Sequence, residues 1–89
     1  MIQREVTLIN RLGLHARAAS KLVQTASNFS AEVWLIRAER RVNAKSIMGV
    51  LLLAAPCGAT LMLEVDGDQE AEAMDALVAL IQDRFGEAE

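Results

Sequence analysis

Stretches in which apolar residues alternate with polar ones, and one short apolar run, predict the strands of a sheet. Residues 2–9 and residues 60–66 alternate with a period of two, as half-buried strands do. Residues 32–37 are aliphatic and aromatic in the middle, and the polar residues 38–41 are expected to turn the chain back into a short strand at Val42. The pattern therefore predicts four strands, two of them joined as a hairpin.

A period near 3.6 residues predicts helices in the remaining segments. Residues 16–28 form an amphipathic pattern, and Ser46 is a candidate N-cap for a short helix in the apolar run that follows, which Pro56 and Gly58 would end. The last helix is expected over residues 69–85, with acidic residues in its first turns. The expected apolar face of the first helix is Ala19, Leu22, Val23 and Ala26, and that of the last is Ala71, Met74, Leu77, Val78, Ile81 and Phe85.

The predicted order of elements is strand, helix, strand, strand, helix, strand, helix. This βαββαβα order suits an α+β fold, an open-faced β-sandwich in which a four-stranded antiparallel sheet carries three helices on one face. Eighty-nine residues without a linker or repeat predict one domain spanning 1–89.

Composition narrows the class of protein. The net charge is −3 and aromatic residues make up 3%, which disfavours nucleic-acid binding, because sheet-surface RNA binders stack bases on aromatic side chains. The nearest group of basic residues, Arg37, Arg40 and Arg41, is expected to consist of solvated hairpin charges. The lone Cys57 excludes an internal disulfide, and no apolar run is long enough to span a bilayer. We therefore expect a cytoplasmic protein without membrane insertion.

His15 is the only histidine, and it stands where the first strand gives way to the first helix. A neutral imidazole nitrogen is nucleophilic, and the N–H groups of Ala16, Arg17 and Ala18 in the first helical turn would be free to bind an anion. Arg17 adds a fixed positive charge, and Gly13 supplies backbone freedom before the helix. These features describe a phosphoryl acceptor, although a lone histidine before a helix can equally be a capping or surface residue.

Two other kinds of site are disfavoured by the same residues. A metal centre lacks a second histidine, and Cys57 alone cannot complete a coordination set. A hydrolase triad lacks a motif that marks a nucleophile beside His15. No cofactor is expected.

Two motifs together resemble the family of histidine-containing phosphocarrier proteins, HPr, of the phosphoenolpyruvate-dependent phosphotransferase system. They are Gly-Leu-His-Ala-Arg-Ala-Ala at residues 13–19 and Lys-Ser-Ile-Met-Gly-Val at residues 45–50. The resemblance implies a carrier without turnover of its own, which takes a phosphoryl group on His15 Nδ1 from enzyme I and passes it to enzyme IIA domains. It implies a phosphate-stabilising role for Arg17, and regulation at Ser46 by a dedicated kinase in some branches, although Ser46 can also serve only as a helix cap.

The chain departs from the family pattern after Arg17, where Ala18 replaces the usual proline. This form is similar to some proteobacterial and nitrogen-related relatives, so the choice between sugar transport and the nitrogen branch stays open. The alternative to a pure carrier is a regulatory interaction module whose phosphorylation state controls partner binding. We expect a monomer that docks its partners through Ile47, Met48, Leu51 and Lys21, with Lys45 nearby; Met48 and Leu51 could instead belong to the core.

Overall fold

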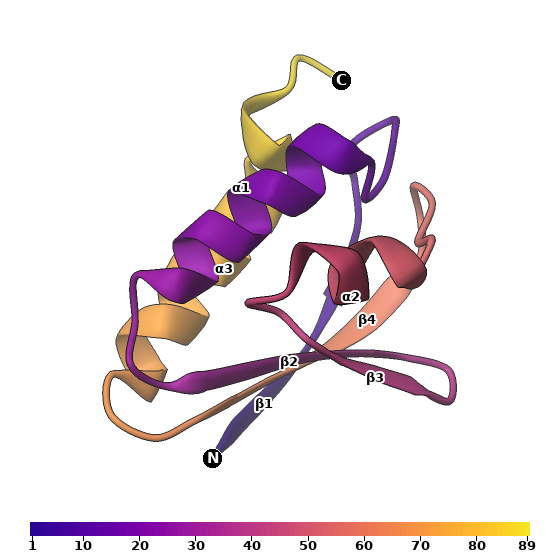
Figure 1. The fold of residues 1–89 in the computed structure, drawn as a ribbon. Coiled ribbons are helices and arrows are strands. Elements are labelled where there is room, and N and C mark those ends of the chain that lie inside the picture. Colours follow the sequence, from indigo (N-terminus) through magenta and orange to yellow (C-terminus); the bar gives the residue numbers. More distant parts are fainter.

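The strands form one antiparallel sheet with three α-helices on a single face (Figure 1). The computed structural model describes residues 1–89. The strands are β1 (Ile2–Thr7), β2 (Glu32–Arg37), β3 (Arg40–Asn43) and β4 (Thr60–Asp66), in the spatial order β1-β4-β2-β3. The helices are α1 (Ala16–Ser27), α2 (Ile47–Leu52) and α3 (Glu70–Gln82), followed by the 3-10 turn Arg84–Gly86. The predicted open-faced sandwich and its order of elements are confirmed.

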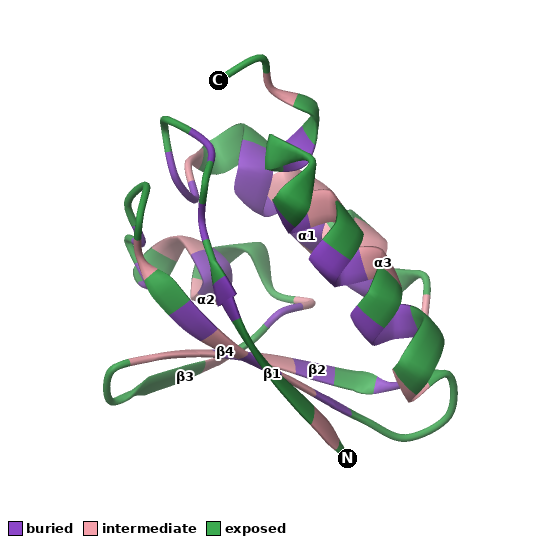
Figure 2. Cartoon of the chain, turned by 180° about the vertical axis from the view of Figure 1, so that it is seen from behind, coloured by how far each residue is buried: buried purple, intermediate pink, exposed green.

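The sheet register places one set of alternating residues in the core. Val65 of β4 lies opposite Ile2 of β1 and Val33 of β2, and Leu63 lies opposite Leu35. All of these except the half-buried Ile2 are essentially inaccessible to solvent. Figure 2 shows the buried residues gathered between this face of the sheet and the helices. Because side chains alternate across a strand, the period of two read from the sequence selects this core face.

Arg40 and Arg41 are exposed, as expected of solvated hairpin charges, and all three hairpin arginines also bind neighbouring elements. Arg37 donates to the carbonyl oxygen of Leu53 over 3.0 Å, and Arg40 donates to that of Leu52 over 3.3 Å. These carbonyls end α2, where a helix has unpaired acceptors and a negative dipole end. The hairpin is thus fastened to the end of α2.

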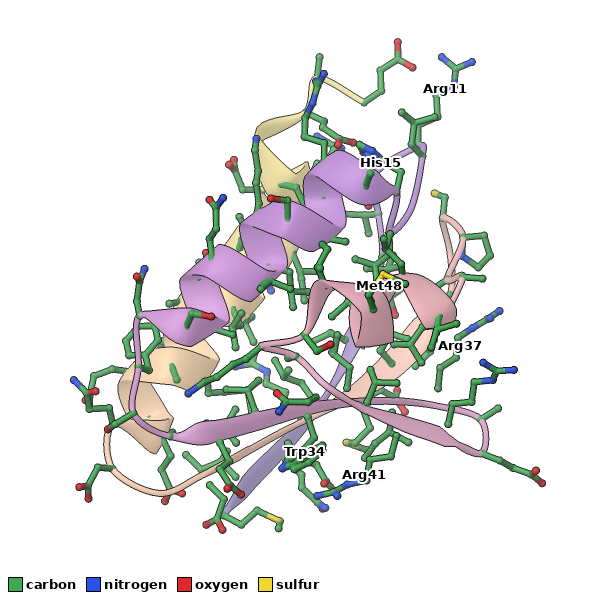
Figure 3. The ribbon with its side chains drawn as sticks, in the orientation of Figure 1. Arg11, His15, Trp34, Arg37, Arg41 and Met48 are labelled. Atoms are coloured by element: carbon green, nitrogen blue, oxygen red, sulfur yellow. The ribbon has the colours of Figure 1, made fainter.

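The third arginine of the hairpin lies on the face of the sheet that has no helices. The guanidinium of Arg41 lies 4.0 Å from the centre of the Trp34 ring and forms an ion pair with Glu64. Figure 3 shows both Trp34 and Arg41 on the side away from the helices. This cation–π contact covers the only tryptophan.

The end of α3 differs from the sequence prediction. The helix stops at Gln82 instead of continuing to Phe85, because Arg84, Phe85 and Gly86 all have positive φ, of 56°, 54° and 77°. Phe85 still reaches the core, with none of its surface exposed. On the helix itself Ala71 is exposed and Ala73 takes the predicted buried position.

The remaining boundaries differ little from the prediction. The first strand ends at Thr7, two residues early, although Leu8 still exchanges backbone hydrogen bonds with Gly58 and Ala59.

None of the helices combines the length and the apolar character needed to cross a membrane.

Candidate functional site

The loop before α1 is held in place by a close backbone approach at Gly13. Gly13 has φ of +65°, and a Cβ added there would lie 2.4 Å from the carbonyl oxygen of Ala55. The next residue, Leu14, donates its N–H to that same oxygen over 2.9 Å and buries its side chain. The predicted need for glycine is confirmed, and its cause is contact with residues 55–56 as well as the dihedral angle.

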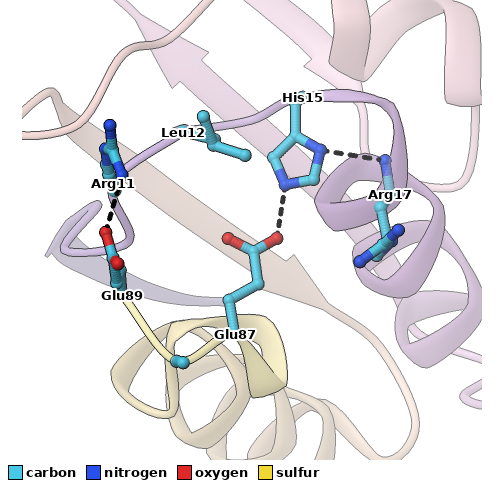
Figure 4. Close-up of a pocket in the computed structure, with 7 residues that line it drawn as sticks. Arg11, Leu12, His15, Arg17, Glu87 and Glu89 are labelled. Atoms are coloured by element: carbon cyan, nitrogen blue, oxygen red, sulfur yellow. Dashed lines mark hydrogen bonds and ion pairs between the residues drawn. The ribbon is translucent and has the colours of Figure 1, made fainter.

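His15 is the N-cap of α1, so the capping and chemical interpretations of this residue apply to one side chain. Its Nδ1 accepts the N–H of Arg17 over 3.3 Å, and 27% of the side chain is exposed. A ring nitrogen that accepts a hydrogen bond carries a lone pair and no proton. The Nδ1 lone pair therefore faces the helix N-terminus at the surface (Figure 4).

The three expected phosphate-binding N–H groups differ in accessibility. The N–H of Arg17 is bonded to Nδ1, and the N–H groups of Ala16 and Ala18 make no hydrogen bond within the chain. Ala16 and Arg17 are exposed, whereas Ala18 is completely buried. The N–H of Ala16 is thus directly available to an anion, the N–H of Arg17 is occupied by Nδ1, and Ala18 is covered in this structure.

A shallow pocket of about 420 Å³ surrounds the exposed side of the ring. The side chain of Arg17 borders it without a hydrogen bond of its own, which leaves the guanidinium fork available. The lining residues are Arg11, Leu12, His15, Arg17, Glu87, Ala88 and Glu89. The C-terminal residues thus form part of the site.

Glu87 and Asn10 are the site residues that sequence reasoning missed. The Glu87 carboxylate pairs with Nε2 of His15, and its other oxygen accepts a hydrogen bond from the Asn10 amide over 3.0 Å. The hydrogen bond from Asn10 is the largest cause that holds the pKa of Glu87 below its ordinary value; burial opposes it, and His15 and Arg17 add smaller effects that lower this pKa. No periodic signal marks either residue, and the two are 77 positions apart.

Lys21 does not border the expected docking surface as a free cation. Its ammonium donates to the carbonyl oxygen of Phe85 over 2.6 Å. Lys45 is likewise occupied, because it donates to the carbonyl oxygen of Phe29 beyond the end of α1 that is remote from His15. These two lysines bind backbone oxygens, so Arg17 is the predicted cation whose charge remains free at the site.

The apolar residues of α2 are only partly arranged as expected. Ile47 and Met48 are exposed, by 38% and 67%, and Figure 3 shows Met48 on α2. Leu51 is instead packed against the core, and Leu52 is exposed by 60%. The large exposed apolar residues of α2 are therefore Ile47, Met48 and Leu52, and Leu51 is partly buried against the core, which is the alternative that its sequence position left open.

Ser46 occupies the predicted N-cap of α2. Its Oγ accepts the N–H of Gly49 over 3.2 Å, and the residue is exposed. The capping role is thus confirmed. The hydroxyl is also open to chemical modification from the solvent side.

Comparison with known proteins gives consistent similarity along the chain. A family model described as PTS HPr component phosphorylation site matches residues 2–83. The phosphocarrier protein HPr of Cupriavidus necator is 61% identical and that of Neisseria meningitidis 54% identical, each over the full length of both chains. The crystal structure of HPr from Thermoanaerobacter tengcongensis aligns with a TM-score of 0.96 at 45% identity, again covering 100% of both chains. The match to the family model contains His15 and Ser46 and ends before Glu87.

Proposed function

Because the chain belongs to the HPr family of phosphocarrier proteins, we propose that it accepts a phosphoryl group on His15 from enzyme I and donates it to enzyme IIA domains. The observation that carries this proposal is the position of Nδ1 of His15, which accepts the N–H of Arg17 at the N-terminus of α1 in a partly exposed side chain.

The transfer needs only groups that are present at this site. The Nδ1 lone pair forms the bond to phosphorus, and the bond from phosphorus to the donor breaks with its electron pair left on the donor. The new phosphoryl group lies at the positive end of α1 and within reach of the Arg17 guanidinium. A helix dipole and one exposed arginine are modest stabilisers, which suits a carrier that must release its phosphate.

Docking of both partners is assigned to the surface around His15. Ile47, Met48 and Leu52 supply exposed apolar contact, and methionine adapts to differently shaped partners. Arg17 supplies positive charge for acidic partners. We propose a monomeric single-domain carrier of the cytoplasm, whose sugar or nitrogen branch is decided by which enzyme IIA it meets.

The proposal is tested by transfer of label. The chain is incubated with enzyme I and labelled phosphoenolpyruvate, and the product is examined for acid-labile phosphate. Wild-type protein should take up the label, and His15→Ala should not. Label that persists in His15→Ala would end the assignment, and transfer to different purified enzyme IIA domains would identify the branch.

Regulation at Ser46 is the second candidate function, and the exposed hydroxyl favours it. A phosphate on Oγ would be stabilised by the helix N-terminus, and it would add negative charge beside the exposed Ile47 and Met48. We expect Ser46→Asp to keep its fold and to lower the rate of phosphorylation by enzyme I. A matched Ser46→Asn variant, which preserves a cap without charge, should transfer normally; equal rates for both variants would contradict this role.

A further inference from the structure

We propose that Glu87 is a positioning residue for phosphoryl transfer, which holds the His15 ring so that Nδ1 remains the nucleophile. This inference rests on the proposed carrier function and assigns a role to a residue outside the part of the chain that the family model matches. It follows from the placement of the C-terminal residues on the pocket (Figure 4).

The two ring nitrogens of His15 have different partners. Nδ1 accepts the N–H of Arg17, whereas Nε2 faces the carboxylate of Glu87. A carboxylate only accepts hydrogen bonds, so the ring proton must lie on Nε2 for this contact to form. The contact therefore selects the tautomer whose Nδ1 carries a lone pair, as a carboxylate does for the histidine of a catalytic triad.

The Glu87 carboxylate is itself bound by the buried side-chain amide of Asn10. Asn10 has none of its surface exposed, and its Nδ2 donates both to Glu87 and to the carbonyl oxygen of Gly13 over 2.7 Å. The same amide therefore binds the loop that carries His15 and the residue that contacts its ring. Only 13% of the Glu87 side chain is exposed, so its position is more restricted than that of a surface glutamate.

The backbone before Glu87 adopts a costly conformation to bring it there. Arg84 and Phe85 have positive φ, a region that is unfavourable for a residue with a side chain. The buried ring of Phe85 and the bond from Lys21 to the Phe85 carbonyl oxygen hold this turn. Strain of this kind, maintained by burial and directed at a reactive side chain, is typical of functional sites.

The contact between Glu87 and His15 also stabilises the ring after it has been phosphorylated. A ring with a phosphoryl group on Nδ1 and a proton on Nε2 carries a positive charge, and Glu87 would offset that charge. The phosphate itself would be on the opposite side of the ring from the carboxylate, next to Arg17 (Figure 4). Glu87 thus favours the phosphorylated ring without directly opposing the phosphate.

The experiment compares Glu87→Ala and Glu87→Gln with wild-type protein by two measurements. Nitrogen-15 NMR of the unphosphorylated ring at about pH 9, where imidazole is neutral, gives the populations of the two tautomers. The initial rate of labelling by enzyme I gives the effect on transfer. Asp83→Asn is the matched control, because it removes one exposed carboxylate from the same segment without touching the ring.

Glu87→Ala should raise the Nδ1-protonated population and slow labelling by roughly 10- to 100-fold, the range for outer partners of metal-bound histidines. Glu87→Gln keeps one acceptor oxygen for the two donors, Asn10 Nδ2 and His15 Nε2, so it should raise the Nδ1-protonated population less than Glu87→Ala does and should slow labelling less. Asp83→Asn should match wild type in both. An unchanged tautomer ratio in Glu87→Ala would overturn the inference, whatever the labelling rate. If wild-type protein took up no label, the proposed carrier function would fail, while the NMR comparison would still decide whether Glu87 sets the tautomer of His15.

Discussion

At the scale of the residue, His15 both caps α1 and presents a nucleophile, and these roles can be separated by substitution. His15→Ala should lower the free energy of unfolding by about 0.5–1 kcal/mol, the lower part of the range for a lost N-cap, because its capping bond is long at 3.3 Å. His15→Asn should recover much of that loss, since asparagine is a good N-cap. Neither variant should accept phosphate. Urea denaturation measures the first effect, and equal stability of the two variants would show that the cap contributes little.

Ala18 is the residue at which the sequence differs from the expected family pattern, and its backbone can accept a proline without losing a hydrogen bond. Its N–H has no acceptor, so Ala18→Pro would break no hydrogen bond. Proline restricts the unfolded chain, which favours folding by about 0.4–1 kcal/mol where the native angle is compatible. We expect Ala18→Pro to be slightly more stable in urea and to transfer phosphate at a rate near that of wild type. An increase in transfer by orders of magnitude would mean that the first turn of wild-type α1 is poorly preorganised.

At the scale of the element, the left-handed turn after α3 connects the core to the site. Phe85→Ala removes a completely buried ring, and such a change costs about 3–5 kcal/mol. It should also release residues 86–89 from the pocket, so labelling of His15 should slow even under conditions where the variant is folded. Phe85→Leu fills most of the space and should have a smaller effect on both. Thermal unfolding and labelling rates, measured together, check this; a Phe85→Ala variant that labelled normally would show that the turn does not serve the site.

Elements with local signals could be predicted from the sequence, and those with distant causes could not. α2 begins after Ser46 as expected, because an N-cap acts within its own turn. β4 spans residues 60–66 as its alternating pattern predicts, because this pattern is also a local signal. Phe85 falls on the helical stripe, so its burial was predictable although the helix ends before it. The contact between Glu87 and His15 joins residues 72 positions apart, and no periodicity encodes such a pairing.

At the scale of the whole molecule, the C-terminal residues close the site that the N-terminal loop begins. Arg11 and Glu89 form an exposed ion pair of 2.9 Å, and the N–H of Arg11 donates to the Glu89 carbonyl oxygen over 2.8 Å. The exposed ion pair contributes little by itself. Asn10, Phe85 and Glu87 supply the buried part of the same attachment. The site is therefore a product of the complete fold, although each of its two segments is short.

The stabilisation of the fold by Glu87 should depend on pH, and the pKa of Glu87 determines in which direction. Its hydrogen bond from Asn10, and then its contact with His15, make that pKa lower in the folded chain than in the unfolded chain. The unfolded state then binds the proton more readily, so the stabilisation is present at neutral pH. It is lost as pH falls from the ordinary glutamate value, ~4.3, through the lower folded value. Wild-type protein should exceed Glu87→Gln in free energy of unfolding at about pH 7, and the difference should shrink at about pH 3, because protonated glutamate and glutamine are both neutral. Urea denaturation at the two pH values measures it, and a difference that stayed constant would show that the Glu87 charge does not stabilise the fold.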